Sequence, residues 1–395
     1  MAPVAFTLCS NNYFSMALTW ADSMRATNPE YITVIGLVDK LNPGVDYPTN
    51  SHVVIAVDEV KVPNIDWMVT HYNIVEFNTA VKPFYFEYLF EKYSAPHVLY
   101  FDPDMLVYSP VSPITSLFDR GELLLTPHVN KPIDKSIYPW ENHFLKHGIY
   151  NLGFAGLRRG NDTARILEWW QGRLREHCFA NAHEGLYVDQ LWANYFPLFF
   201  DSVVIVRHPG ANVAFWNLHE RDISTSNGKW TVNGEPLIFF HFSSFNPASP
   251  SALTKEGYSS FDLKKSVEVQ TLAKEYASQV MTNHFEKYRR IPFGFQTAIE
   301  LKGGLNEIGV RINRKERILN LLLLRLIKKE RLIGFVVSLL RDYAEYDMKQ
   351  FRVKTESVYT IEGIRNKNEA LRKRRNGGIM FRLRLLASSF ISFIR

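Results

Sequence analysis

Short apolar runs alternate with helical patterns along the first part of the chain. Runs of the length and composition of buried strands lie at 4–9, 32–38, 53–57 and 98–101. Apolar residues at helical spacing lie at 14–26, 79–93 and, further along, 162–178. This strand and helix alternation predicts an α/β fold of the doubly wound kind.

Two carboxylates follow the strand predicted at 98–101. Asp102 and Asp104 are two residues apart, so they face the same way on an extended backbone, and Pro103 marks the point where the strand leaves its sheet. Open α/β sheets bind ligands at this edge, and acids there need a charge partner. We expect Mg²⁺ or Mn²⁺ that also binds phosphate oxygens. The alternative is an ordinary pair of solvated acids. A glycosidase pair is disfavoured, because its carboxylates stand about 5 Å or more apart across a cleft.

Further polar groups lie in apolar surroundings in the second half of the chain. Asn151 opens a strand-like stretch, and His241 lies within an aromatic one. Asp189 and Gln190 stand where a helix is expected to begin. Taken singly, Asp189 is either a helix cap or a functional acid, and His241 is either a satisfied core residue or a functional one.

Composition places the chain among globular proteins. It has 395 residues, of which 46% are hydrophobic and 14% aromatic, enough for one large core and a smaller second one. Cys9 and Cys178 are too few for a disulfide framework or a zinc site, which indicates a reducing compartment. No Gly-X-Gly-X-X-Gly or Gly-Lys-Ser/Thr loop follows a strand, so a plain dinucleotide enzyme or a P-loop NTPase is disfavoured.

Charge is distributed unevenly along the chain. Residues 1–300 hold 24 Lys and Arg against 31 Asp and Glu, whereas residues 301–395 hold 22 against 9. Amphipathic helical patterns lie at 313–340 and 379–395, and the basic run Arg372–Arg375 precedes the second. Such a basic, amphipathic end predicts a helix on an anionic membrane surface. The alternative is a terminal helix packed on its own domain or on a partner. Nucleic acid is a poor partner for the acidic body.

We expect three regions along the chain. They are a catalytic domain at 1–255, a helical region at 256–348, and a basic connector with a terminal helix at 349–395. Val4–Cys9 already reads as a core strand, and no apolar stretch reaches the ~18 residues of a membrane span. We therefore expect a cytoplasmic protein, attached peripherally to the inner face of the plasma membrane through its basic end.

Together, these motifs follow the order seen in nucleotide-sugar glycosyltransferases of the GT-A fold, and they resemble family 8 and its relatives most closely. The fold implied is a Rossmann-like mixed sheet flanked by helices, followed by a mainly helical basic region. The similarity covers roughly residues 4–250. The stretches that carry it are Leu8–Tyr13, Thr79–Pro83, Asp102–Asp104, Asn151–Gly153, Asp189–Gln190 and His241–Ser243.

The resemblance implies a role for each matching residue. Asp102, Asp104 and His241 would be the metal ligands, and this set favours Mn²⁺ over Mg²⁺. The nucleotide-sugar donor would be held by Cys9, Asn11, Asn12, Asp39, Lys82, Asp102 and Gly153, with Lys82 approaching the diphosphate or the sugar. Sugar transfer would take place beside Asn151, Asp189 and Gln190, with retention of the anomeric configuration.

The expected function is therefore transfer of a sugar from a nucleoside-diphosphate sugar, taken to be a UDP-sugar, to a saccharide or lipid-linked acceptor in bacterial surface polysaccharide or glycolipid synthesis. Two departures stand out. The family's Lys after the late His is missing from Ser243–Pro247, and Leu191 replaces the acid that often follows the Asp-Gln pair. The alternatives are a nucleotidylyltransferase, which usually has a Gly-rich basic loop after the first strand, and a non-catalytic sugar-nucleotide-binding or assembly protein.

Overall fold

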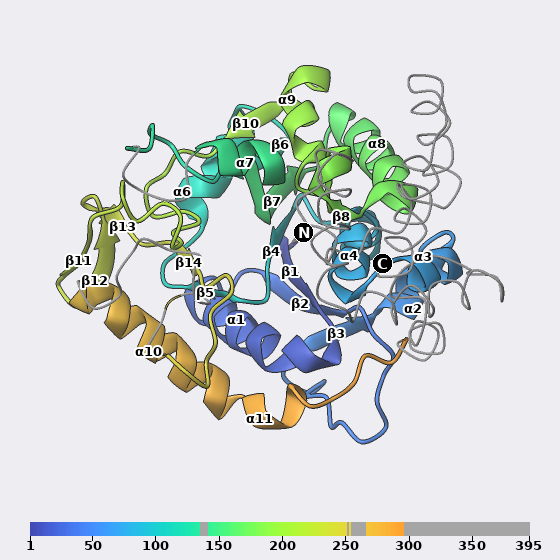
Figure 1. Cartoon of the computed structure of the whole chain (residues 1–395), viewed down its shortest axis with the longest axis horizontal. Coiled ribbons are helices and arrows are strands. Elements are labelled where there is room, and N and C mark those ends of the chain that lie inside the picture. The colour runs from blue at the N-terminus through green and yellow to red at the C-terminus, as the bar shows by residue number, and fades with distance from the viewer. Residues whose placement is uncertain (135–140, 251–252, 254–265, 296–395) are drawn as a thin grey trace, which may run out of the picture. The chain divides into compact units, whose positions relative to one another are not determined.

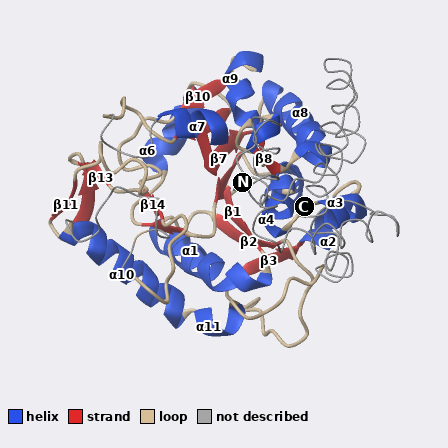
Figure 2. Cartoon of the chain, in the orientation of Figure 1, coloured by secondary structure: helices blue, strands red, loops and turns tan. Residues whose placement is uncertain are grey.

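The structure is a computed structural model that describes residues 1–134, 141–250, 253 and 266–295. Within these residues, a mixed sheet has seven strands in the order β10-β6-β7-β4-β1-β2-β3, with helices on both faces (Figures 1 and 2). Its strands are β1 Val4–Cys9, β2 Ile32–Leu37, β3 Val53–Ala56, β4 His97–Phe101, β6 Leu123–Pro127, β7 Tyr150–Arg158 and β10 Val203–Ile205. Only β7 runs antiparallel to its neighbours in this sheet. The predicted α/β class and mixed sheet are confirmed.

The chain reverses its direction of travel across the sheet at β1. From β1 it passes to β2 and β3 on one side, and it then returns to β4 on the other side of β1. Ligands of open α/β sheets bind at the carboxyl ends of the strands beside such a reversal. Because β7 is antiparallel to β4, its amino-terminal end lies at this same edge.

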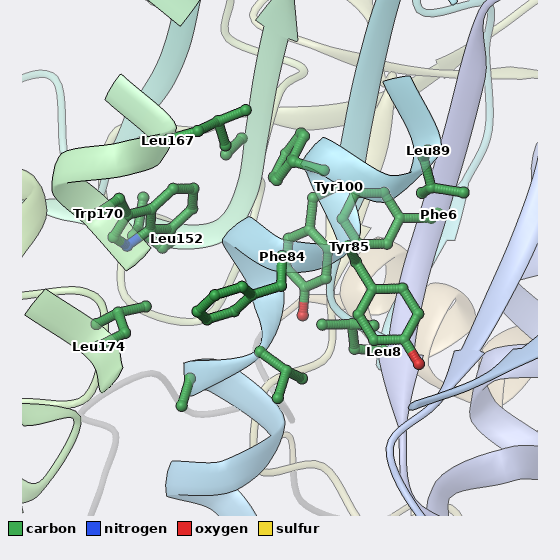
Figure 3. Packing of buried hydrophobic residues seen from close by; sticks show 14 of the residues in the cluster. Phe6, Leu8, Phe84, Tyr85, Leu89, Tyr100, Leu152, Leu167, Trp170 and Leu174 are labelled. Carbon is green, nitrogen blue, oxygen red and sulfur yellow. The ribbon is translucent and has the colours of Figure 1, made fainter. Parts of the chain in front are cut away.

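Helices cover both apolar faces of the sheet and the segments around it. The helices of the described residues are α1 Phe14–Thr27, α2 Val57–Val60, α3 Ile65–His71, α4 Ile74–Ala80, α5 Lys82–Tyr93, α6 Ser112–Thr115, α7 Glu141–His147, α8 Asn161–His177, α9 Phe196–Phe199, α10 Val267–Thr282 and α11 Phe285–Tyr288. On one face, α5 and α8 pack against the strands (Figure 3), and Phe6 of β1 meets Phe86 of α5 edge to face with ring centroids 4.9 Å apart. On the other face, Trp20 of α1 packs against Phe101 of β4. Burial of each aromatic or large aliphatic side chain of this kind contributes about 1.5–3 kcal/mol to the stability of the fold.

Three smaller sheets and several short turns complete the described fold. β5 Met105–Val107 pairs with β14 Phe239–His241, β8 Ala180–Asn181 pairs with β9 Leu186–Tyr187, and β11 Ile223–Ser226, β12 Lys229–Val232 and β13 Glu235–Pro236 form the third sheet. The 3-10 turns are η1 Asn11–Tyr13, η2 Ser116–Asp119, η3 Ala182–Glu184 and η4 Trp192–Tyr195. The ring of Tyr276 from α10 stacks on Phe242 just after β14, with centroids 4.1 Å apart. Contacts within the chain define a compact unit from Met1 to Gln296, and the boundary expected near residue 255 stays a prediction.

Several expected elements differ in detail. The helix expected at 79–93 is divided at Val81 into α4 and α5, because Pro83 lies in the first turn of a new helix, where its missing N–H costs nothing. The helix expected from Asp189 begins only at η4, after a turn. The predicted helices at 313–340 and 379–395 lie outside the described residues. Across the ranges that the structure does describe, no helix combines the length and apolar character that a membrane span requires. Cys9 and Cys178 are free and buried.

Candidate active site

The candidate site lies where β4 leaves the sheet. Asp102 directly follows β4, and its N–H still donates to the carbonyl of Gly153 on β7 at 2.7 Å. The chain then turns through Pro103 into β5, which pairs with β14 so that His241 lies opposite Met105 (Figure 1). The N–H of Phe242 donates to the Asp104 carbonyl at 2.8 Å. The strand pairing therefore holds His241 beside Asp102 and Asp104.

Asp102, Asp104 and His241 form a compact group of three ligand-type side chains. Their donor atoms all lie within 4.8 Å of one another. Nε2 of His241 is 3.1 Å from Asp104 Oδ1 and 3.7 Å from Asp102 Oδ2. The His241 side chain is 4% exposed, whereas the two carboxylates are partly exposed. A ligand can thus reach the oxygens while the imidazole is held from behind.

The donor set fits a divalent cation. Two carboxylates and an imidazole suit Mn²⁺, Mg²⁺ or a similar ion. Nε2 of His241 faces both acids, while its Nδ1 is buried and has no hydrogen-bond partner among the described residues. Burial alone would lower the pKa of His241, but the carboxylates of Asp104 and Asp102 outweigh it and raise that pKa. The two carboxylates therefore favour positive charge at this point.

Gly153 leaves room for the imidazole. A Cβ at this position would lie 2.6 Å from Cε1 of His241 and 2.8 Å from Cε of Met105. A side chain at position 153 would displace the ring. Gly153 on β7 thus contributes to the site by leaving space for the His241 ring.

Behind the acids lies a buried chain of charged and polar groups. The Tyr100 hydroxyl donates to Asp102 Oδ1 at 2.5 Å. Nζ of Lys82 lies 4.2 Å from the centre of the Tyr100 ring, and it donates to Asp189 Oδ2 at 2.5 Å and to the Leu152 carbonyl at 2.9 Å. Burial raises the pKa of Asp102 and of Asp189, and the charge of Lys82 opposes both shifts. Lys82 and Asp189 are thus paired with each other beneath the site, and Asp189 caps no helix.

Three of the residues expected to hold the donor, Asn11, Asn12 and Asp39, lie just after β1 and β2. Asp39 is fully buried, and its carboxylate accepts N–H groups from Asn11, Lys40 and Gly294 at 2.7–3.1 Å. Burial raises its pKa, although these hydrogen bonds oppose the shift. The Asn11 side chain donates to the Lys40 carbonyl at 3.0 Å and accepts from the Tyr47 hydroxyl.

Asp39 and Asn11 therefore organise the loops at this edge through contacts within the chain. Two other residues of the predicted set lie nearby. Asn12 follows Asn11 in η1, and its buried Oδ1 has no partner in the part of the chain that the structure describes. Cys9 is the last residue of β1, and its side chain is buried.

The structure also brings Asn151 and Gln190 together. Asn151 Nδ2 donates to Gln190 Oε1 at 3.2 Å, and so does the Leu152 N–H at 3.2 Å. Gln190 Nε2 donates to the carbonyl of His147 at 2.7 Å. A Cβ at Gly148, where φ is +115°, would lie 2.8 Å from Cγ of Gln190, so this glycine gives the side chain its space.

Sequence reasoning missed four residues of this site. Tyr100 contacts Asp102, and the Trp216 ring meets the His241 ring edge to face at 5.2 Å. His128 and Asn212 both hydrogen-bond the side chain of Asn151. His128 carries a signal that was available, because it follows the apolar run of β6 as Asp102 follows β4. Asn212 lies in an irregular segment with no such pattern, and only the fold brings it here.

No family model matches the chain. Two proteins of Bacillus subtilis (strain 168) are similar to it in sequence. The uncharacterized protein YfnF is 31% identical over 160 residues, which are 38% of this chain and 50% of YfnF. The uncharacterized protein YfnD is 25% identical over 194 residues, which are 48% of this chain and 60% of YfnD. The chain thus spans about half to three fifths of the length of these relatives.

Solved structures similar to this chain are glycosyltransferases. The galactosyltransferase LgtC, in complex with donor and acceptor sugar analogues, has 16% identity, covers 75% of this chain and 99% of its own, and gives a TM-score of 0.42. The glycosyltransferase GlyE of Streptococcus pneumoniae TIGR4 has 14% identity, covers 74% and 65%, and also gives 0.42. The class of these neighbours is the one that the sequence motifs resemble, while membership of family 8 stays a prediction. These TM-scores carry no functional argument, so the function rests on the side chains of the site.

Proposed function

We propose that this chain is a metal-dependent glycosyltransferase that moves a sugar from a nucleoside-diphosphate sugar, with UDP-sugars as the first donors to test, to a saccharide or lipid-linked acceptor. The observation that carries the proposal is the convergence of Asp102, Asp104 and His241 at the edge of the sheet where the order of strands reverses, between β1 and β4. Nucleotide ligands bind at that edge in open α/β sheets, and carboxylate-bound cations bind diphosphates. We place the acceptor in bacterial surface polysaccharide or glycolipid synthesis, on the sequence resemblance alone.

Asp102, Asp104 and His241 would hold the cation, with Mn²⁺ favoured by the imidazole. When bound, the metal would act as a Lewis acid that offsets the charge that builds on the diphosphate leaving group. The Tyr100 hydroxyl fixes one oxygen of Asp102, so that the other is turned toward His241. This fixed arrangement is what preorganised electrostatic catalysis requires.

Lys82 supports the site from beneath. Its side chain is 1% exposed and already has two partners, the carboxylate of Asp189 and the carbonyl of Leu152. We infer that Lys82 acts on the donor through its charge and through the position of Asp189. This differs from the direct contact with the diphosphate that the resemblance implies.

Retention of the anomeric configuration is part of the proposal. An inverting enzyme needs a carboxylate base beside the acceptor hydroxyl. Asp189 precedes Gln190 in the chain, but its carboxylate is buried and bound to Lys82. This pairing supports a mechanism without Asp189 as the base.

The basic C-terminal part would hold the enzyme at the inner face of the plasma membrane. This proposal rests on Arg372–Arg375 and on the apolar stripe at 379–395, which follow the acidic body in the sequence. Both lie outside the described residues. A lipid-linked acceptor would then be within reach of the site.

One experiment separates the proposed function from its alternatives. The full chain is incubated with Mn²⁺ and a panel of UDP-, GDP- and TDP-sugars, and free nucleoside diphosphate and sugar are measured. A glycosyltransferase releases nucleoside diphosphate from one donor of the panel, by slow hydrolysis or by transfer. In a parallel incubation with sugar phosphate and nucleoside triphosphate, a nucleotidylyltransferase would instead form the nucleoside-diphosphate sugar and release pyrophosphate. Binding of donors with no turnover would leave a non-catalytic binding protein and overturn the proposal.

A further inference from the structure

The side chain of Asn151 has no free hydrogen-bonding group. Its Nδ2 donates to Gln190 Oε1 at 3.2 Å and to His128 Nε2 at 3.3 Å. Its Oδ1 accepts from Asn212 Nδ2 at 3.0 Å and from the Gly153 N–H at 3.2 Å. A side-chain amide offers two N–H donors and an oxygen with two lone pairs. All four positions are therefore used within the protein.

The orientation of this amide is decided by His128. Nδ1 of His128 lies 3.2 Å from the carbonyl of Ile149, which only accepts, so Nδ1 carries the proton. Nε2 is then an acceptor, and it must face the Nδ2 of Asn151. Phe144 stacks on the His128 ring at 4.7 Å and Trp216 meets it at 5.3 Å, so the ring is held in place. Burial lowers the pKa of His128 to about 3, which keeps the ring neutral at physiological pH.

Asn212 fixes the other end of the amide. Its Nδ2 donates to Thr126 Oγ1 and to Asn151 Oδ1, both at 3.0 Å. The residue has φ of +50°, a conformation that asparagine tolerates better than most residues. The side chain of Asn217 accepts the Ala214 N–H and donates to the Asn212 carbonyl, which holds this segment.

Asn151 in turn fixes the orientation of the Gln190 side-chain amide. Oε1 of Gln190 accepts two N–H groups, from Asn151 and Leu152, and one N–H of its Nε2 goes to the carbonyl of His147. The carbonyl oxygen is thus turned into the protein with both lone pairs used. What Gln190 retains for a ligand is the second N–H of Nε2.

We propose that His128 and Asn212 are positioning residues that hold the amide of Asn151, and through it that of Gln190, so that Gln190 presents an N–H donor to the ligand. The group it meets is an oxygen acceptor, such as a sugar hydroxyl or the oxygen that leaves with the diphosphate. Asn151 is then also a positioning residue, rather than one that lines the pocket. The kinetic part of this inference rests on the proposed glycosyltransferase activity, whereas the hydrogen-bond arrangement does not.

The first test reads the tautomer of His128 without any substrate. The full chain is labelled with ¹⁵N-histidine, and the His128 signals are assigned by their loss in His128→Gln. At pH 7 we expect a protonated, pyrrole-type Nδ1 and a pyridine-type Nε2. A proton on Nε2, or a doubly protonated ring, would reverse the Asn151 amide and overturn the inference.

The second test measures steady-state hydrolysis of whichever UDP-sugar the wild-type chain turns over with Mn²⁺. Asn212→Asp keeps the size and the tolerance for positive φ but removes both donors, so kcat should fall about tenfold or more while KM for the donor changes less than about twofold. His128→Leu should behave in the same way, and His128→Gln, which restores an acceptor, should recover part of kcat. Asn227→Asp is the matched control, because Asn227 has φ of +52° and is exposed in the turn between β11 and β12.

Unchanged kcat in folded Asn212→Asp would overturn the inference, as would a parallel loss in the control variant. If the wild-type chain hydrolyses no donor at all, the proposed function fails, and the tautomer measurement still decides the hydrogen-bond arrangement. A thermal melt of each variant shows whether it folds.

Discussion

Lys82 at the start of α5 and Asp189 in the turn before η4 form an ion pair with Nζ and Oδ2 2.5 Å apart, although 107 residues separate them in the chain. The two side chains are 1% and 3% exposed. Buried charges of this kind are tolerated only when each has its partner. The pair therefore ties α5 to the turn that carries Gln190.

Breaking this pair should cost stability. Lys82→Met leaves the Asp189 carboxylate buried without a partner, and we expect the free energy of unfolding to fall by about 3–5 kcal/mol. The double variant Lys82→Met/Asp189→Asn should recover part of that loss, because no unpaired charge is left. Lys92→Met is the control, since Lys92 is 37% exposed and lies 3.9 Å from Glu59. Urea unfolding at pH 7 measures all three, and equal losses in Lys82→Met and Lys92→Met would contradict the prediction.

Removing one acid of the metal group should abolish activity and leave the fold intact. In Asp104→Ala the backbone bond from Phe242 to the carbonyl of residue 104 remains, while a metal ligand is lost. We expect donor turnover to fall by about 100-fold or more, with a melting temperature close to that of the wild type. Asp66→Ala, in the exposed first turn of α3, should retain activity. Full turnover of the wild type in excess chelator would remove the metal from the mechanism.

His128 should make stability depend on pH. Its pKa is lowered to about 3 by burial, against about 6.5 in an unfolded chain. Below pH 6.5 the unfolded state takes up a proton that the folded state does not. The free energy of unfolding therefore decreases as the pH falls from 6.5 toward 3. The slope from this residue approaches about 1.4 kcal/mol per pH unit. His128→Gln should therefore flatten the free energy of unfolding between pH 4 and 6.5, and identical slopes in the two proteins would rule out the shift.

Sugar transfer should proceed with retention. The Asp189 carboxylate is bound to Lys82 beneath the site, and Leu191 offers no second acid after Gln190. Proton NMR of freshly formed product should therefore show the anomeric configuration of the donor. An inverted product would require a carboxylate base, with Asp189 as the first residue to test, and the functional assignment would have to change.

The C-terminal tail should bind anionic membrane. The run Arg372–Arg375 would gain about 1 kcal/mol per charge near an anionic surface. A chain truncated after Glu369 should no longer sediment with anionic vesicles, while its donor hydrolysis in solution is unchanged. Neutral vesicles serve as the control. Sedimentation equal to that of the full chain would exclude the tail as the anchor, and unfolding on truncation would favour the packed terminal helix.

Local patterns along the chain were sufficient for the strands β1 to β4, but they did not predict β6 or β10. The apolar runs predict β1 with its observed bounds and β2 to within one residue, because a parallel strand buried on both faces needs uninterrupted apolar side chains. Asp102 and Asp104 are recognisable because carboxylates at the end of such a strand need a partner. The sequence pattern missed the division between α4 and α5. Pro83 near the start of the expected helix did not show whether that helix begins at 79 or a second helix begins at Lys82.

Only the tertiary structure decides which distant residues complete the site. The pairing of β5 with β14 brings His241 to the acids, and the antiparallel β7 brings Asn151 to the carboxyl edge of the parallel strands. The contacts of Lys82 with Asp189, of Asn151 with Asn212, and of Asp39 with Asn11 and Gly294 join residues 28 to 255 positions apart, which no local pattern encodes. The sequence by itself thus determined the strands β1 to β4, because these depend on short-range burial, while the chemistry of the site stays a prediction from the same local patterns. The hydrogen bonds that orient its side chains depend on long-range contacts, and the folded chain alone makes them.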